Sequence, residues 1–443
     1  MQQVLFDIPF LKGWWVIPAD GIPVSGFGAM LFVTFIVCTM WATRRGKTAG
    51  LAAEKTQDMV LWIFIAGLIG ARTLYMIQYS HQFPNKDIVS LVVAFAQIWK
   101  GGIIFYGSAL GGVIGYALFY KYVLKKLNVS GWRLADAMAP VLALGLAIGR
   151  IGCYLNGCCW GQVAIDEVAP VPLGAAHYPL LAAHCRDDMV RGFGLQSSTG
   201  FTISPRDFGQ PANDPRSVVQ FVEKNSAADR AGLKPGDRVV RVNGLPNAAY
   251  LQLDGSGEAL SRAWDELRKQ PGAKEAPTPE YAASFDDVKD FERAALSLDR
   301  AGVRFVSSDR LAELVRDWPR GRHDVEIGVL RDGNEVSLPP FSPRSVGLYP
   351  TQLYETLSMV LLILLLVAYY PFRRHDGQLM VLCMMCYSVH RFIDESLRIE
   401  PAIGLGLTLS QWGSVVIFSA ATGIEIFLRR TMPSRWAHPQ PIV

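Results

Sequence analysis

Three arginines lie inside or at the edges of long apolar stretches, where a charged side chain is costly. They are Arg150, Arg391 and Arg398. On insertion scales a charge at the bilayer centre costs about 2.5 to 3.5 kcal/mol, so a charged residue there marks a functional site by default. The alternative role for an arginine at a helix end is that of a snorkelling topology anchor.

The polar residues of the apolar blocks gather in four short segments. These are WKGGIIFYGSALGG (99–112), GRIGCYLNGCCWG (149–161), YPTQLYE (349–355) and YSVHRFIDESLR (387–398). In the last segment Tyr387 precedes Arg391 by four residues and Glu395 follows it by four, which places all three on one helix face. Glu395 would then orient the Arg391 guanidinium. The alternative for this pair is simple stabilisation of the helix.

Seven stretches are long and apolar enough to be membrane helices, which need roughly 20 residues. In a bilayer the backbone can satisfy its own hydrogen bonds only as a helix or a closed barrel. The stretches cover residues 27–42, 59–79, 103–122, 134–155, 353–370, 378–392 and 407–427. A shorter run at 88–99 is too brief to span and is expected to be interfacial or re-entrant. The predicted fold class is an α-helical polytopic membrane protein with about seven transmembrane helices.

Basic residues cluster after every second span, which predicts the orientation because short loops rich in Lys and Arg stay in the cytoplasm. The clusters begin at Arg44, Lys121, Arg373 and Arg429. The N-terminus is therefore expected outside and the C-terminus inside, with no cleaved signal peptide. The net charge is +4, and its basic residues lie mainly in these few clusters. This distribution favours a role in membrane orientation over a nucleic-acid-binding surface.

Residues 162–346 form a hydrophilic insert that this orientation places on the outer side. The insert separates an N-terminal membrane block of four helices (1–161) from a C-terminal block of three (347–443). Its segment SVVQFVEKNSAADRAGLKPGDRVVRVNG predicts two strands around a short helix and a Pro235-Gly236-Asp237 turn. The later DVEIGVLRDGNEVSLPP predicts a hairpin that turns at Asp332-Gly333.

These strand and turn patterns resemble a PDZ domain, an α+β fold, which we expect over about residues 192–343. Residues 245–322 are more than such a domain needs. They contain helical runs and an Ala/Pro/Glu-rich segment, PGAKEAPTPEYAAS, which is a candidate mobile link. The resemblance implies β-augmentation, in which an extended peptide pairs with an exposed strand edge. The alternative role is a structural cover over the membrane site.

The membrane blocks resemble the prolipoprotein diacylglyceryl transferase family. The resemblance rests on GRIGCYLNGCCWG, PTQLYE and YSVHRFIDESLR, in that order, among spans of the family's orientation. It implies transfer of a diacylglyceryl group from phosphatidylglycerol to the lipobox cysteine thiol of prolipoproteins. A thioether forms and glycerol phosphate leaves. It also implies a bacterial inner membrane location, prolipoprotein signal peptides as partners and no cofactor.

Such a reaction needs cations at the departing phosphate and a group that helps to deprotonate the thiol. Arginine suits the first task because its fork pairs with phosphate oxygens and stays charged. Carried over from the family, the expected catalytic residues are Tyr106, Arg150, Arg391 and Glu395, and no metal site is expected. The expected substrate-binding residues are Gly102, Asn156, Gly161, Gln352, Tyr354, Tyr387 and Arg398. Asn156, Gln352 and Tyr354 either bind headgroup oxygens or tie helices together.

The chain departs from the family pattern at four positions. Tyr106 and Tyr349 stand where histidine is usual, Cys153 replaces an asparagine and Cys158 a glutamate. Tyrosine, with an ordinary pKa of about 10, is a weak base unless nearby arginines lower that value. These departures leave open a second hypothesis, a non-catalytic phospholipid-binding receptor whose PDZ-like domain captures peptides. A third is a lipid-modifying enzyme of altered chemistry that uses the new cysteines.

Cysteines also concentrate at the outer end of the fourth predicted helix, as Cys153, Cys158 and Cys159, with Cys185 soon after. An outer compartment permits disulfides. Adjacent Cys158 and Cys159 do not suit a bond to each other, so Cys153 or Cys185 would be the partner. A metal site that combines Cys185 with His177 and His184 matches no zinc spacing.

Overall fold

The computed structural model describes residues 3–9, 22–80, 87–97, 102, 104–164, 170–181, 189–192, 194–204, 214–255, 258–276, 281–319, 321–432 and 434. The chain divides into two compact units. One combines Met1–Gln162 with Pro350–Val443, and the other is Val163–Tyr349. Each unit is described by itself.

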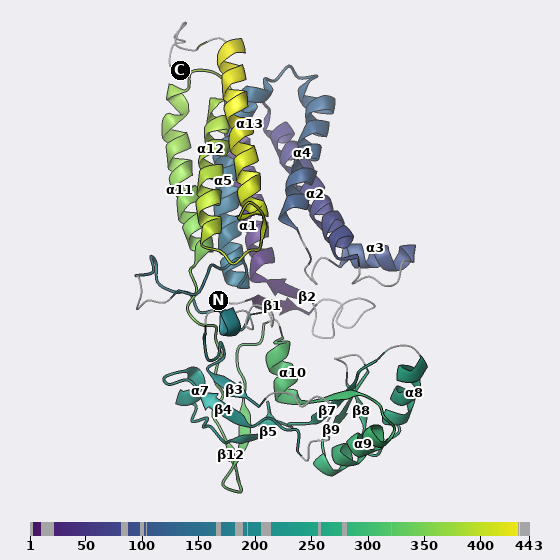
Figure 1. Ribbon diagram of the computed structural model, residues 1–443. Helices are drawn as coiled ribbons and strands as arrows, with labels where there is room; N and C mark the ends of the chain where they lie inside the picture. The colour runs from purple at the N-terminus through teal and green to yellow at the C-terminus, as the bar shows by residue number, and fades with distance from the viewer. Residues whose placement is uncertain are drawn as a thin grey trace. The chain divides into compact units, whose positions relative to one another are not determined.

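The first unit is a helical bundle (Figure 1). Its long helices are α1 (Gly26–Thr48), α2 (Ala53–Gln78), α5 (Gly131–Asn156), α11 (Thr351–Tyr369), α12 (Gln378–Ser396) and α13 (Leu409–Thr431). Helix α4 (Phe105–Phe119) continues into a π-helical turn (Tyr120–Leu124), and α3 (Ile88–Ala96) is short. Two hairpins complete it, β1 (Val4–Ile8) with β2 (Ile22–Ser25) and β13 (Ala402–Gly404) with β14 (Leu407–Thr408).

Five described helices, α1, α2, α5, α11 and α13, are long and apolar enough to cross a membrane. Large apolar side chains such as Ile69, Leu361 and Val416 are exposed on them, as expected for surfaces that face lipid. A polytopic helical membrane protein is thus confirmed, but the predicted count of seven is not. Helix α4 has only 15 residues, and α12 carries Arg391, Asp394 and Glu395 within its 19 residues.

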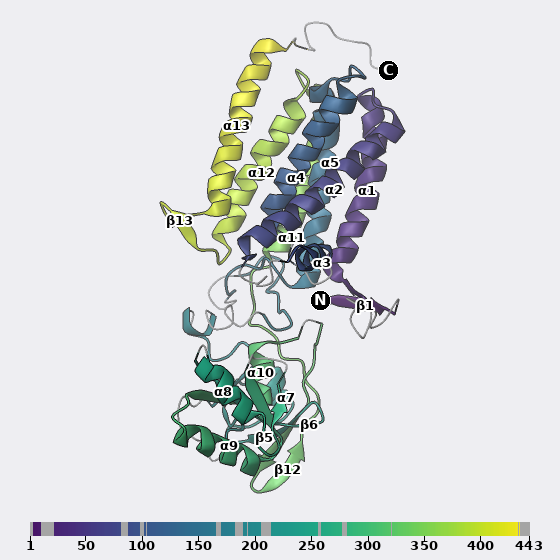
Figure 2. The same cartoon turned by 90° about the vertical axis from the view of Figure 1, so that its right-hand side faces the viewer.

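Helices α2 and α4 pack closely through small residues. A Cβ atom added at Gly107 would collide with the Gly70 carbonyl oxygen, and one at Gly111 with the carbonyl oxygen of Ala66. Glycines four residues apart on α4 therefore allow backbone contact between the helices. In Figure 2 the two helices run side by side.

Helices α5 and α12 are joined at the end where α12 begins. Asp136, fully buried on α5, accepts hydrogen bonds from the backbone N–H groups of Gly377 (2.9 Å) and Leu379 (2.8 Å). These N–H groups lack partners within their own helix, so a side chain of one helix caps the other. The contact sets the position of α12 along α5.

The second unit contains the expected strands around a short helix. Helix α7 (Ala227–Arg230) lies between β4 (Val219–Val222) and β5 (Arg238–Val242). β5 pairs with β11 (Ile327–Arg331) and β6 (Leu245–Pro246), β11 pairs with β12 (Asn334–Ser337), and β4 pairs with β3 (Phe201–Ile203). Their core includes Phe201, Val239 and Ile327. The turn between β11 and β12 places Asp332 and Gly333 at φ of +50° and +81°, as the sequence predicts for a tight hairpin.

A second subdomain is nested within this unit. It holds β7 (Ala249–Leu253), α8 (Glu258–Leu267), β8 (Lys274–Glu275), β9 (Ala282–Phe285), α9 (Val288–Arg300) and β10 (Phe305–Asp309). The sheet order is β10-β7-β9-β8, and Leu251, Phe285 and Phe291 lie in its core. At PGAKEAPTPEYAAS, the candidate mobile link, the described residues include β8 and part of β9, which pair with each other. Residues 277–280 lie outside the described part.

Asp309 joins the two subdomains. Its carboxylate accepts hydrogen bonds from the Ser217 backbone N–H (2.5 Å) and from Asn247 Nδ2 (2.6 Å), and it caps α10 (Arg310–Arg316) at Ala312 N (2.8 Å). The side chain is 1% exposed. A buried carboxylate with several donors holds together strands that are distant in the sequence.

Candidate active site

The polar segments meet at one end of the helical bundle. Helices α5 and α12 end there, while α11 and α13 begin there, because neighbouring helices run in opposite directions (Figures 1 and 2). Helix α12 contacts α5, α11 and α13. Residues from opposite ends of the sequence are thereby brought to one place.

Arg150 and Arg391 share one buried carboxylate. Arg150 Nε lies 2.8 Å from Glu355 Oε2, and Arg391 Nη1 lies 3.9 Å from the same oxygen. The Glu355 side chain is 1% exposed, and those of Arg150 and Arg391 are 17% and 12% exposed. Two positive charges therefore flank one negative charge in a water-poor place.

Acidic groups of its own helix also hold Arg391. Its Nη2 lies 2.5 Å from Glu395 Oε2, and its Nη1 lies 3.4 Å from Asp394 Oδ2. Glu395 Oε1 accepts a hydrogen bond from Thr408 Oγ1 (3.0 Å), the residue that caps α13. Arg391 Nη2 also donates to Ser410 Oγ (3.0 Å). The pair that the sequence predicts on one helix face is present, and α13 supports it.

Arg398 is mostly buried although it follows the end of α12. It lies 3.6 Å from Glu395 Oε2 and 2.9 Å from Glu400 Oε1, and its side chain is 11% exposed. Its backbone pairs with Gly161 as an isolated β-bridge, next to a hydrogen bond from Gln162 N to the Leu397 carbonyl (2.7 Å). Because a snorkelling anchor is exposed to water or headgroups, this burial argues against that role.

The loop after α5 is fixed by the first turn of α11. Gly157 ends α5 in the left-handed conformation at φ +70°. Gln352 Nε2 then donates to the Cys158 carbonyl (2.6 Å), and Thr351 Oγ1 donates to the Cys159 carbonyl (2.7 Å). Gln352 was expected either to bind headgroup oxygens or to tie helices together, and this contact is of the second kind. Asn156 contributes its carbonyl to Gln3 Nε2 (3.0 Å).

Several buried polar atoms at this site have no hydrogen-bond partner among the described residues. They are Glu355 Oε1, His390 Nε2, Asp394 Oδ1, Trp160 Nε1 and Arg398 Nε. Buried polar atoms are nearly always paired in folded proteins, so this cluster is a place where a polar ligand or ordered water can bind. Glu355, His390 and Asp394 also bring potential metal ligands within 4.8 Å. The nearby arginines already neutralise Glu355, which disfavours a cation there.

The predicted residues from the first half of the chain are less fully described. Tyr106 lies in the first turn of α4, and its side chain is outside the described residues. Gly102 is described at φ +82°, where an added Cβ would collide with Tyr75 and Arg72. Arg72 donates to the Gly102 carbonyl (3.0 Å) and to the Phe95 carbonyl near the end of α3 (3.2 Å). Tyr354 and Tyr387 lie on α11 and α12, and Tyr387 packs against the bundle core.

Sequence reasoning missed Glu355, His390 and Asp394 as members of the site. Glu355 is the last residue of the YPTQLYE segment, and a carboxylate in the first turns of an apolar helix is itself a signal. His390 and Asp394 lie beside Arg391 in YSVHRFIDESLR. The sequence showed these residues next to the predicted ones, but it did not show that Glu355 pairs with Arg150 on α5.

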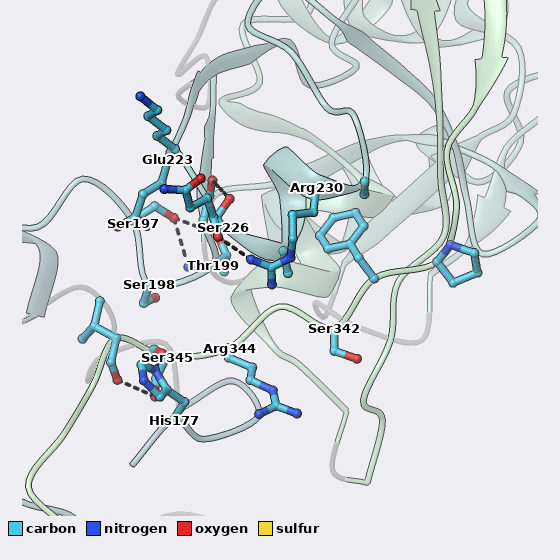
Figure 3. A pocket seen from close by; sticks show the side chains of 18 of the residues that line it. His177, Ser197, Ser198, Thr199, Glu223, Ser226, Arg230, Ser342, Arg344 and Ser345 are labelled. Carbon is cyan, nitrogen blue, oxygen red and sulfur yellow. Dashed lines mark hydrogen bonds between the residues drawn. The ribbon is translucent and has the colours of Figure 1, made fainter. Parts of the chain in front are cut away.

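A cleft of about 680 Å³ lies within the insert. It is lined by the loop before β3, by α7 and by the segment after β12, with Arg230 and Arg344 among its side chains (Figure 3). In the loop, Ser197 Oγ and Thr199 Oγ1 both donate to the Phe201 carbonyl (2.6 and 2.9 Å). Gly200, at φ +87°, has no room for a side chain beside Ser226. These contacts hold the loop in its conformation, and the basic side chains of the cleft outnumber its one acidic side chain, Glu223.

Residues 15–205 and 306–427 match the model of the prolipoprotein diacylglyceryl transferase family. This is more than half of the chain, in the same segments that build the site. The chain belongs to the prolipoprotein diacylglyceryl transferase family. Residues 190–256 match the PDZ domain. The two resemblances seen in the sequence are therefore confirmed. Most of the nested subdomain, after residue 256 and before residue 306, lies outside both matches.

Individual members of the family are also similar to this chain in sequence. The phosphatidylglycerol–prolipoprotein diacylglyceryl transferase of Rhodopirellula baltica is 26% identical over 92% of this chain and 73% of its own length. The enzyme of the same name from Thermosynechococcus vestitus is 33% identical over 35% of this chain and 59% of its own length. The one from Wigglesworthia glossinidia brevipalpis is 31% identical over 31% of this chain and 46% of its own length.

Proposed function

We propose that this protein transfers a diacylglyceryl group from phosphatidylglycerol to the lipobox cysteine thiol of prolipoproteins. The acceptor thiol loses its proton, and its sulfur attacks the glyceryl carbon that carries the phosphate. A C–S bond forms, the C–O bond breaks, and the electron pair leaves with glycerol phosphate. The observation that carries the proposal is the pair of buried arginines around Glu355, in a chain of the transferase family.

Arg150 and Arg391 are proposed to bind the phosphate that leaves. Arg150 faces Glu355 through Nε and has two Nη groups beyond it, whereas the Nη groups of Arg391 also face Asp394, Glu395 and Ser410. The bidentate guanidinium fork matches phosphate oxygens. As the C–O bond breaks, the phosphate gains charge, so the arginines stabilise the transition state more than the bound lipid. Glu355 and Glu395 hold the two guanidiniums in place.

Arg398 and the unpaired Trp160 Nε1 and His390 Nε2 are proposed to contact the polar headgroup. Donors of this kind match the hydroxyl and phosphate oxygens of phosphatidylglycerol. Asn156, Gly161, Tyr354 and Tyr387 are proposed to contribute further contacts to the lipid. Asn156 is the last residue of α5, Tyr354 is in the first turn of α11, and Tyr387 is midway along α12. Tyr106, in the first turn of α4, is proposed to act in catalysis, and Gly102, just before that helix, to bind substrate.

The orientation is proposed from the basic clusters. Lys47, Lys125 and Arg429 lie near the ends of α1, α4 and α13, at the end of the bundle away from the arginine site. The positive-inside rule makes that end cytoplasmic in a bacterial inner membrane, with the N-terminus and the insert outside. The site then faces the compartment in which prolipoproteins present their lipobox.

The insert is proposed to bind an extended peptide at its positively charged cleft. Arg230 and Arg344 suit a peptide carboxylate, and the neighbouring β3 edge suits main-chain pairing. Because the cleft belongs to the insert alone, peptide binding and lipid transfer are separable. Substituting Arg230 and Arg344 by alanine would weaken peptide binding and leave lipid transfer at Arg150 unchanged.

Transfer with purified components tests the reaction. The full chain in micelles is mixed with radiolabelled phosphatidylglycerol and a prolipoprotein signal peptide that contains the lipobox cysteine. The expected result is a labelled peptide with the mass of one added diacylglyceryl group and stoichiometric glycerol phosphate. A peptide with serine in place of the cysteine is the control. If the protein binds phosphatidylglycerol but transfers nothing, it is a phospholipid receptor instead.

A further inference from the structure

Three cysteine thiols converge beside the arginine site. The Sγ atoms of Cys153, Cys158 and Cys159 lie within 4.8 Å of one another, and all three are free thiols. Cys153 is in the last turn of α5, and the left-handed Gly157 turns the chain so that the next two residues face back toward it. Cys158 Sγ lies 3.7 Å from the Cys153 carbonyl. The proposed transfer reaction as written above uses none of the three.

The loop after α5 brings the three thiols together although one of its residues has an unfavourable backbone conformation. Cys159 has φ +62°, in the left-handed region that costs a residue with a side chain about 1 kcal/mol or more. The hydrogen bonds from Gln352 and Thr351 to the Cys158 and Cys159 carbonyls maintain it. Such strain persists where the surroundings over-determine the geometry, often at functional sites.

We propose that Cys153, Cys158 and Cys159 bind one thiophilic d¹⁰ metal ion, Zn²⁺ or Cu⁺, and leave one coordination position open. Zn–S bonds of about 2.3 Å place tetrahedral sulfur ligands about 3.8 Å apart, so the three thiols need only small side-chain movements. Three thiolates carry one negative charge more than Zn²⁺ can neutralise. The charges of Arg150 and Arg398 act on Cys159 and reduce the cost of that extra negative charge.

Positive charge lies close to the thiols, since the guanidiniums of Arg398 and Arg150 act on Cys159, which lies beyond the last residue of α5. Nearby positive charge favours thiolate, the form that binds metals. A disulfide between two of the three cysteines would leave the third thiol without a role. A single metal ion uses all three, which accounts better for their convergence.

The open position suits the acceptor thiol, an assignment that rests on the proposed function. A thiol that coordinates a metal ion is deprotonated and gives its proton to water. The bound sulfur then attacks the glyceryl carbon as written above, and the metal keeps its oxidation state. This supplies a means of deprotonation in a chain where Tyr106 replaces the family's usual histidine. A catalytic zinc site keeps such a position free, whereas a structural one fills it.

Metal binding is measured first, because it does not depend on transfer activity. The reduced full chain in micelles is stripped with a chelator, then dialysed separately against Zn²⁺ and Cu⁺, and bound metal is counted by elemental analysis. The expected result is about one equivalent of one metal, and loss of it in Cys153→Ser and Cys159→Ser. Cys386→Ser, a cysteine on α12 outside the cluster, is the matched control and retains the metal. Equal elution volume and melting temperature establish that the variants are folded.

The open position is then tested with Co²⁺ as a spectroscopic probe. Bound Co²⁺ shows sulfur charge-transfer bands, and a peptide with the lipobox cysteine should change them, while its serine counterpart should not. If neither Zn²⁺ nor Cu⁺ binds the reduced protein, or if the cysteine variants bind as wild type does, the proposal is overturned. A Cys153 disulfide in protein isolated without reductant, combined with no metal binding after reduction, overturns it in favour of a redox pair.

The outcomes also separate this proposal from the proposed function. Metal binding and a peptide-dependent Co²⁺ spectrum without any lipid transfer would refute the transferase activity but leave the metal site standing. Equal transfer by metal-free and metal-loaded protein would refute the metal's role in activating the thiol. The expected result is at least about tenfold slower transfer by the metal-free protein, restored by adding back the ion.

Discussion

Arg150 Nε lies 2.8 Å from Glu355 Oε2, although the whole soluble insert separates these two residues in the sequence. The ion pair joins the last turns of α5 to the first turns of α11, at a position where Glu355 is almost fully buried. Removing one partner of a buried pair leaves the other charge uncompensated and typically costs 3–5 kcal/mol. The pair therefore fixes an arginine at the site and joins the two membrane segments of the chain.

Arg150 and Arg391 are expected to be required for transfer. Arg150→Ala and Arg391→Ala should each lower the transfer rate by about 10²-fold or more, because a positioned guanidinium stabilises the charge that develops on the leaving phosphate. Lysine should not rescue either variant, since it presents a point charge in place of a planar fork. The measurement is transfer of labelled lipid by purified variants, and Arg430→Ala, exposed at the end of α13, is the control. Full activity in Arg391→Ala would end this mechanism.

Glu355 is expected to act by positioning the arginines. Glu355→Gln keeps the shape of the side chain but removes the charge that Arg150 and Arg391 share, so the transfer rate should fall by roughly tenfold or more. A positioning role predicts that the double variant Glu355→Gln with Arg150→Ala is scarcely slower than Arg150→Ala alone. Additive losses in that double-mutant cycle would show that Glu355 acts independently of Arg150.

Tyr106 is expected to be useful but replaceable. Tyr106→His should retain transfer and could raise it, because imidazole titrates near neutral pH whereas a phenol ordinarily does not. The change is measured as kcat/KM for the acceptor peptide across a pH series, with Tyr106→Phe as the matched variant that lacks an ionisable group. Loss of all activity in Tyr106→His, with the protein still folded, would contradict this role.

The orientation in the membrane is expected to leave the insert outside and the basic loops inside. Single cysteines at Lys224, in the insert, and at Lys125, after α4, are both exposed positions. In a background without native cysteines, an impermeant maleimide should label position 224 in intact spheroplasts and position 125 only after lysis. Labelling in the reverse order would overturn the proposed topology and the outer location of the insert.

The insert is expected to fold alone as a soluble fragment of residues 163–349, because it is a compact unit with its own cores. Asp309→Ala should lower its free energy of unfolding by about 2–4 kcal/mol, since it leaves the donors of Ser217 and Asn247 without a partner. Asp254→Ala, an exposed surface pair with Arg304, should change it by less than about 0.5 kcal/mol. Urea unfolding measures both, and equal effects would contradict the linking role of Asp309.

Local relationships were predictable from the sequence because regular geometry determines them. Arg391 and Glu395 are four residues apart, so any helix brings them together, and the structure shows the ion pair. The Asp332-Gly333 turn follows from residues that tolerate positive φ. Apolar length likewise predicted the membrane helices, although the charged residues of α12 and the shortness of α4 leave only five described helices that meet the criterion.

Relationships between distant residues were decided by tertiary packing. Neither the pairing of Arg150 with Glu355 nor the sharing of Glu355 by Arg391 has a sequence signal, because it depends on which ends of α5, α11 and α12 lie together. The same holds for the three cysteines, whose sulfur atoms converge only because Gly157 reverses the chain and α11 holds the loop. In the insert, β8 and β9 form from a segment rich in Ala, Pro and Glu, where pairing with β7 and burial outweigh a weak local preference for strand.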